Sequence, residues 1–180
     1  MLQITVPGLE KWDEEKLEFI YTEPYTLRLE HSLVSLSKWE SKWCKPFLSK
    51  DNKTVEQIIH YVKCMTINQN VPEYVYENLT NGNIEDVTTY INAPMTATTF
   101  NDHSNTINRE IVTSEIIYYW MVALNIPFEC QKWHLNRLLT LIRVCNIKNA
   151  PPKKMGKREM LNRNAALNAA RKKQLNTKGW

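Results

Sequence analysis

Residues 54–65 read Thr54-Val55-Glu56-Gln57-Ile58-Ile59-His60-Tyr61-Val62-Lys63-Cys64-Met65, and this stretch gives the clearest indication of a helical fold. Thr54 and Gln57 form a capping box, in which the threonine hydroxyl accepts a backbone N–H and the glutamine side chain reaches back to the amide of the cap. Behind the box, apolar side chains recur three and four residues apart, at Val55, Ile58, Ile59, Val62 and Met65. The stretch therefore predicts an amphipathic helix with one face in a core.

Similar helical patterns lie on both sides of this segment. After Ser32, one apolar stripe predicts a helix that Pro46 ends, and it consists of Leu33, Leu36, Trp39 and Trp43. Short helices are predicted at residues 72–79 and 83–91, because Pro72 suits a first helical position and Asn83 can cap a helix.

The most apolar part of the chain comes later. Thr113 is predicted to cap a helix that runs through Leu124, and after the turn Asn125-Ile126-Pro127 another long helix continues to about Cys145. Because the turn is short, we expect the two helices to pack antiparallel as a helical hairpin. The second helix is apolar on more than one side, which predicts a place at the centre of the bundle, through Trp133, Leu135, Leu138, Leu139, Leu141, Ile142 and Val144.

The first thirty residues have a different period. Residues 2–6, 17–21 and 26–30 are short alternating runs separated by Pro7-Gly8 and Glu23-Pro24, which predicts a small antiparallel sheet that packs on helices. Residues 93–105 lack any helical period and are predicted to form a long loop. The fold class is therefore mainly α (α+β): a helical bundle with a small N-terminal antiparallel sheet and a basic helical C-terminal extension.

Composition and length indicate a globular protein of one main domain. Hydrophobic residues make up 43% of the 180 residues and charged residues 23%, which is typical of a chain with a packed core. The N-terminus has no secretory signal pattern, and no apolar run approaches the length that spans a bilayer. We expect a soluble protein that stays in a cell.

Ala150-Pro151-Pro152 marks a boundary between a body of residues 1–147 and an extension of residues 148–180. The extension has ten Lys or Arg and one acidic residue, a local charge of +9, whereas the rest of the chain has 13 basic and 18 acidic residues, a charge of −5. Residues 157–176 have fair helix propensity but few apolar side chains to bury. We expect this segment to fray when it is free and to become ordered on a partner.

The basic extension is the candidate binding site. Its candidate partner-binding residues are Lys153, Lys154, Lys157, Arg158, Arg163, Arg171, Lys172 and Lys173. Three interpretations stay open: binding of phosphates, binding of an acidic protein surface, and a solvated tail without a partner.

No catalytic or metal site is expected from the sequence. Cys44, Cys64, Cys130 and Cys145 include no Cys-x-x-Cys pair, and we interpret them as free thiols. Cys130 and His134, four residues apart, could form a nucleophile and base or two metal ligands, but a third ligand or an orienting carboxylate is lacking nearby in the sequence. His31, His60 and His103 are isolated, so we interpret them as structural or solvated.

Trp39 and Trp43, with Lys38, Lys42 and Lys45 around them, have two interpretations. They could stack on single-stranded nucleic acid, or they could complete the apolar core stripe while the lysines reach solvent. We favour the core interpretation.

Four segments resemble a family of small phage proteins, the tail assembly chaperones of tailed double-stranded-DNA bacteriophages. These segments are Leu29-Glu30-His31-Ser32-Leu33-Val34-Ser35-Leu36-Ser37-Lys38-Trp39-Glu40-Ser41-Lys42-Trp43, Ala93-Pro94-Met95-Thr96-Ala97-Thr98-Thr99-Phe100, Phe128-Glu129-Cys130-Gln131-Lys132-Trp133-His134-Leu135-Asn136-Arg137-Leu138-Leu139 and Asn162-Arg163-Asn164-Ala165-Ala166-Leu167-Asn168.

The resemblance implies a non-enzymatic protein of the host cell cytoplasm that binds the phage tape measure protein and keeps it soluble during tail assembly. Other tail proteins and further copies of the chain are additional candidate partners, whereas nucleic acid, a membrane, metals and cofactors are not expected. The alternatives are a virion structural component, such as a head-tail connector or tail completion protein, and a nucleic-acid-binding protein that uses the basic tail.

Overall fold

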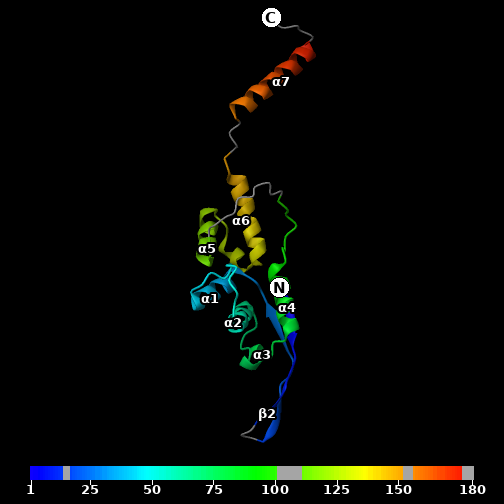
Figure 1. Ribbon diagram of the computed structural model, residues 1–180, viewed down its shortest axis with the longest axis vertical. Helices are drawn as coiled ribbons and strands as arrows, with labels where there is room; N and C mark the ends of the chain where they lie inside the picture. The colour runs from blue at the N-terminus through cyan, green and yellow to red at the C-terminus, as the bar shows by residue number, and fades with distance from the viewer. Residues whose placement is uncertain (14–16, 101–110, 152–155, 176–180) are drawn as a thin grey trace. The chain divides into compact units, whose positions relative to one another are not determined.

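The computed structural model describes residues 1–13, 17–100, 111–151 and 156–175. These residues are mostly helical, with seven α-helices and small antiparallel strand pairs near the N-terminus, which confirms the expected fold class (Figure 1). The chain divides into two compact units, Met1–Ile147 and Lys148–Trp180, each with its own internal contacts.

The elements follow one another along the chain as strands and then helices. The strands are β1 (Leu2–Val6), β2 (Glu10–Asp13), β3 (Glu18–Tyr21) and β4 (Tyr25–Leu29). The helices are α1 (Leu33–Trp43), α2 (Val55–Met65), α3 (Glu73–Glu77), α4 (Asn81–Asn92), α5 (Ser114–Ala123), the 3₁₀ helix η1 (Phe128–Lys132), α6 (Leu135–Asn149) and α7 (Lys157–Leu175).

The strands form two separate antiparallel pairs. β1 pairs with β4 from Leu2↔Leu29 to Val6↔Tyr25, and β2 pairs with β3 from Glu10↔Tyr21 to Asp13↔Glu18. β2 was not predicted, because only one of its four residues is strongly apolar. The inward side chains of the first pair are fully buried and join the core of the body: Ile4, Val6, Leu27 and Leu29.

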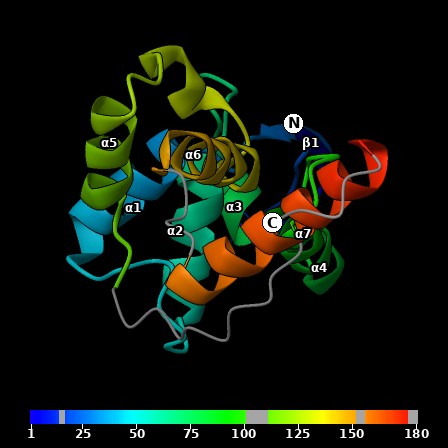
Figure 2. The same cartoon turned by 90° about the horizontal axis from the view of Figure 1, so that it is seen from above.

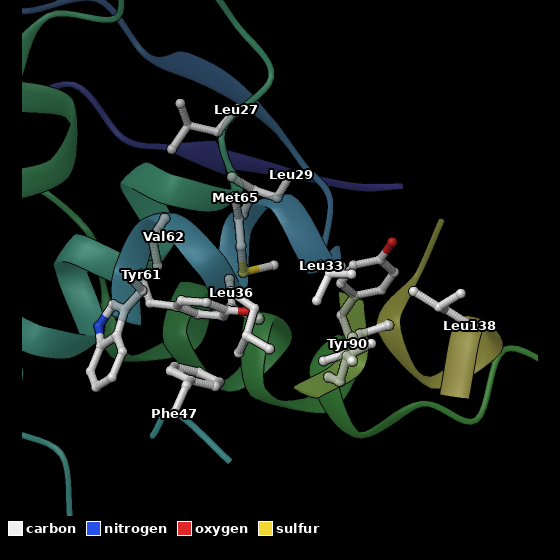
Figure 3. Close-up of a cluster of buried hydrophobic side chains, with 14 of the residues drawn as sticks. Leu27, Leu29, Leu33, Leu36, Phe47, Tyr61, Val62, Met65, Tyr90 and Leu138 are labelled. Carbon is white, nitrogen blue, oxygen red and sulfur yellow. The ribbon is translucent and has the colours of Figure 1, made fainter. Parts of the chain in front are cut away.

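The core of the body lies between this strand pair, α1 and α2 (Figure 3). Leu33, Leu36 and Trp39 of α1 are buried, as the sequence stripe predicts. The ring of Tyr61 on α2 stacks on Phe47 at 3.9 Å between centroids. The Tyr61 hydroxyl lies within hydrogen-bonding distance, 2.6 Å, of the Nδ1 atom of His31. This partner allows the polar hydroxyl to be buried in the core.

The inward face of α2 differs from the predicted stripe. The Thr54 capping box is present, as expected, but Val55 is exposed and Ile59 is only partly buried. The buried side chains are Gln57, Tyr61, Val62 and Met65. The expected stripe was therefore wrong on one side, because apolar periodicity gave no weight to Tyr61.

Helices α3 and α4 begin at other residues than the sequence suggested. Pro72 is the N-cap of α3, one residue before its first helical position. The N-cap of α4 is Thr80, and Asn83 occupies the N3 position of the same capping box. The expectation that Asn83 caps the helix was therefore wrong. The Asn83 amide also donates to the carbonyl of Thr5 at 3.2 Å, which ties α4 to β1.

The predicted antiparallel hairpin of two apolar helices is not formed as a closely packed pair. The connection between α5 and α6 contains η1, Trp133 lies at the end of η1, and α6 begins only at Leu135. α5 contacts α1 more extensively than it contacts α6, and Figure 2 shows α5 beside α1. A groove next to α5 and α6 is lined by residues 48–50 and by apolar side chains that include Ile111, Trp120 and Leu139.

The burial of α6 is one-sided. Leu135, Leu138 and Ile142 are buried, whereas Leu139, Leu141 and Val144 are only partly buried. The expectation of a helix surrounded by core on several sides was therefore wrong. The predicted loop at residues 93–105 has no helix or strand through Phe100, and its remainder lies outside the described residues.

A buried carboxylate from α1 takes the role expected of Thr113 at the start of α5. Thr113 is the N-cap by position, but its side chain makes no capping hydrogen bond. Instead, Glu40 accepts hydrogen bonds from the backbone N–H of Ser114 at 2.7 Å and of Phe47 at 2.8 Å. A negative charge at a helix N-terminus is favourable because the free N–H groups there carry partial positive charge. Glu40 thus fixes α5 to α1.

Candidate functional site

Helix α7 carries most of the residues proposed from the sequence as a binding site. Lys157, Arg158, Arg163, Arg171, Lys172 and Lys173 all lie on it and are exposed, whereas Lys153 and Lys154 lie outside the described residues. None of the 19 residues of α7 is buried. Within its own unit α7 has no apolar core to pack on, and packing of that kind stabilises most protein helices.

The basic residues of α7 gather toward its two ends. Lys157 and Arg158 lie in the first turn, and Arg171, Lys172 and Lys173 lie in or next to the last turn, about 20 Å further along at 1.5 Å per residue. Cations near the C-terminal end of a helix interact favourably with its free carbonyl groups. The charges do not form a single stripe, so the helix offers positive potential on several sides.

Exposed apolar side chains lie among these charged residues. Met160, Leu161, Leu167 and Leu175 are between 47% and 71% exposed. At 100° per residue, the four fall within one half of the helix circumference. Lys157, Arg171 and Lys172 fall in the same half, so α7 mixes positive charge with exposed apolar side chains, which suits an acidic surface with apolar pockets better than phosphates alone.

The tryptophan pair of α1 belongs to the core. Trp39 is buried, and its indole Nε1–H donates to the carbonyl of Gln57 at 2.9 Å. Trp43 is partly buried and donates to Nδ1 of His60 at 3.2 Å. Both rings pack against the core and donate hydrogen bonds within the body, so the core interpretation describes them better.

Cys130 and His134 do not form a nucleophile and base. Cys130 is buried in η1. His134 lies just before α6, where its Nε2 donates to the carbonyl of Tyr90 at 3.0 Å and its Nδ1 accepts from the backbone N–H of Asn136 at 3.3 Å. With both ring nitrogens engaged by backbone, the imidazole orients α6 against α4.

A second cysteine and histidine pair was missed by sequence reasoning, although its spacing of four residues on a helix could have revealed it. The Cys64 sulfur lies 3.7 Å from Nδ1 of His60. Burial raises the pKa of the Cys64 thiol, and burial together with Lys42 and Lys63 lowers the pKa of His60. A neutral thiol beside a neutral imidazole is the opposite of the thiolate and imidazolium pair of cysteine enzymes.

The expectation that His31 and His60 are isolated was wrong, although His31 is structural as expected. The His31 and His134 rings lie 5.1 Å apart in an edge-to-face arrangement, and burial followed by His134 lowers the pKa of His31 to about 3. Beside them, the Tyr90 hydroxyl donates a hydrogen bond to the Glu30 carboxylate at 2.6 Å. The same carboxylate forms an ion pair with the N-terminal amine. These groups form a polar network inside the body. His103 lies outside the described residues.

Within the described ranges, no group of three or more His, Cys, Asp or Glu side chains is placed to hold a metal ion. In the same ranges, no helix is long and apolar enough to cross a membrane. Comparisons of the chain with protein-family models, with curated proteins and with solved structures give no significant match. The tail assembly chaperone family therefore remains a hypothesis from sequence resemblance.

Proposed function

We propose that this chain is a bacteriophage tail assembly chaperone: a binding protein without enzymatic activity that holds the tape measure protein soluble in the host cell cytoplasm during tail assembly. The observation that supports this most is α7, a 19-residue helix with no buried residue, basic ends and four exposed apolar side chains. Such a helix gains most of its stability from a partner, because tertiary packing contributes more to helix stability than propensity does.

The chemistry of α7 suggests how the partner is held. Its exposed apolar side chains can enter a groove between helices of the partner, while the basic ends pair with acidic residues beside that groove. The body supplies a stable platform, since Glu40 and the His31 and His134 network hold its helices together. The resemblance of the four quoted segments to the chaperone family gives the partner its identity in this proposal.

Affinity purification of the tagged chain from infected host cells tests the proposal. We expect the tape measure protein to co-purify with the wild-type chain and to be lost with Arg171→Glu, Lys172→Glu and Lys173→Glu combined. Lys45→Glu with Lys50→Glu is the matched control, because both lysines are exposed residues of the body. Recovery of no tail protein with the wild-type chain would contradict the proposal.

Mass spectrometry of purified virions separates the chaperone from a structural component. A chaperone leaves before the particle is complete, so we expect at most trace amounts of the chain in virions. Abundant, stoichiometric copies would favour a connector or tail completion protein instead.

The +9 charge of residues 148–180 favours one second candidate, a nucleic-acid-binding protein. Such binding would weaken steeply as salt rises, because each phosphate contact releases counterions. We expect only feeble binding to duplex DNA at physiological salt. Tight, sequence-selective binding that is lost on removal of residues 153–180 would replace the chaperone proposal with this candidate.

A further inference from the structure

The β2–β3 hairpin carries an aromatic face that is open to solvent. Glu10 is opposite Tyr21 and Trp12 is opposite Phe19, so all four side chains lie on the same face of the hairpin. The Trp12 and Phe19 rings meet edge to face at 4.8 Å between centroids. Trp12, Phe19 and Tyr21 are nevertheless 45%, 54% and 72% exposed. Exposed apolar groups of this size commonly mark an interaction surface.

The two chain segments at the base of the hairpin are held together by hydrogen bonds. The backbone N–H of Thr22 donates to the carbonyl of Leu9 at 2.9 Å, and the N–H of Leu9 donates to the Thr22 hydroxyl at 2.7 Å. Gly8 lies so close to the carbonyl of Thr22 that a Cβ atom would overlap it. The hairpin therefore continues from the β1–β4 pair, and Figure 1 shows β2 at the end of the body away from α5 and α6.

The charge of the hairpin selects a cationic occupant. Residues 10–23, which are the hairpin with Thr22 and Glu23 next to its base, contain six acidic and two basic residues, a charge of −4, whereas all other residues before 148 together carry only −1. Two such hairpins placed face to face would repel each other, and so would the hairpin and nucleic acid. A partner that fits must combine positive charge with apolar side chains for the aromatic rings.

Helix α7 has this chemistry. Residues 157–175 contain six basic residues and one acidic residue, a charge of +5, together with the exposed side chains Met160, Leu161, Leu167 and Leu175. Arginine and lysine bind the faces of aromatic rings through cation–π attraction, and methionine sulfur makes favourable contacts with them. Every copy of the chain has one such helix and one such hairpin.

We propose that the aromatic face of the β2–β3 hairpin binds helix α7 of a second copy of this chain. The contact joins an acidic segment, residues 10–23 with a charge of −4, to a +5 helix, and it covers the exposed rings of Trp12, Phe19 and Tyr21. Because the two surfaces differ, it is a heterologous contact, which closes into a dimer only when both copies exchange their helices. The chaperone proposal assigns the same helix to the tape measure protein, so the two partners would compete for α7, and only substitutions in the hairpin test the contact between copies alone.

Sedimentation velocity of the full chain tests it, at concentrations of about 1 to 100 µM, where small interfaces dissociate. We expect reversible association that weakens as salt rises. Trp12→Ser with Phe19→Ser should raise the dissociation constant about tenfold or more, since aromatic anchors dominate such contacts. Tyr119→Ser with Val122→Ser, which removes similarly exposed side chains on α5, should leave it unchanged. Circular dichroism of each variant verifies that the fold is intact.

A charge exchange tests whether these two surfaces meet each other. Glu10→Lys with Glu23→Lys should weaken association, as should Arg171→Glu, Lys172→Glu and Lys173→Glu together. A single chain that carries all five substitutions should associate with a dissociation constant closer to the wild-type value. A chain that stays monomeric at about 100 µM, association unaffected by either set, or no restoration in the combined variant would each overturn the proposal.

Discussion

Replacement of Glu40 is the sharpest test of how the body is held together. Its carboxylate is buried and accepts hydrogen bonds from the backbone N–H groups of Phe47 and Ser114. Glu40→Ala leaves both donors buried without a partner, at about 1–3 kcal/mol each, so it should lower the free energy of unfolding by about 2–6 kcal/mol. A domain of this size has about 5–15 kcal/mol in total, so the alanine variant risks not folding. Glu40→Gln is the safer variant, because it keeps the shape and one acceptor oxygen.

Equilibrium unfolding in urea measures the effect. We expect Glu40→Gln to lower the free energy of unfolding by about 1.5–3 kcal/mol, the contribution of one hydrogen bond to a charged group. Glu115→Gln is the matched control, because Glu115 lies in the turn of α5 that Glu40 caps but is exposed. This substitution should change the free energy of unfolding by less than about 1 kcal/mol. Equal urea midpoints for Glu40→Gln and the wild type would refute the assignment of Glu40 as the cap of α5.

Three further measurements test the core, its histidines and the extension. In thermal melts, Leu138→Ala should cost about 2–5 kcal/mol, whereas Leu139→Ala and Ile59→Ala, at partly buried positions, should cost clearly less; equal losses would contradict the observed burial. Folding lowers the pKa of His31 to about 3, so the unfolded chain binds a proton at His31 more readily than the folded chain does. The free energy of unfolding should therefore be at its full value above pH 6.5 and fall by up to about 5 kcal/mol as the pH drops toward 3. A flat urea midpoint across that pH range would contradict this sign. In limited proteolysis, residues 148–180 should be cut before the body, since α7 has no buried residue; the reverse order would contradict it.

Local sequence chemistry predicted the parts of the fold that depend on neighbouring residues. The Thr54 capping box and the Leu33, Leu36 and Trp39 stripe each involve residues within a few positions of one another, and both are present in the structure. The cap of α4 was assigned to Asn83 instead of Thr80, because both residue types cap helices and the sequence alone did not select between them.

The errors arose from contacts between distant parts of the chain. Glu40 caps a helix 74 residues further on, and the expected pairing of α5 with α6 gave way to contacts of α5 with α1. His31 was considered isolated because its partners, Tyr61 and His134, are 30 or more residues away. Pattern analysis of a single sequence contains no information on such pairs.

The two candidate interaction surfaces differ in how visible they are in the sequence. The basic extension is recognised by its high content of Lys and Arg, so its residues can be named from the sequence alone. The aromatic face of the β2–β3 hairpin was missed for two reasons. Trp12 is the only strongly apolar residue of β2, so the strand was not predicted, and only the pairing register shows that Trp12 lies beside Phe19. Aromatic residues two apart, as in Phe19 and Tyr21, were the available hint.

We propose that the chain binds a tail protein through its basic helix. The most direct measurement is binding of the purified tape measure protein to the full chain, compared with the variant carrying Arg171→Glu, Lys172→Glu and Lys173→Glu. We expect a soluble complex with the wild-type chain and an affinity at least about tenfold weaker with the variant, while Lys45→Glu with Lys50→Glu binds normally. Equal affinity for all three chains, or no complex with the wild-type chain, would contradict the claim.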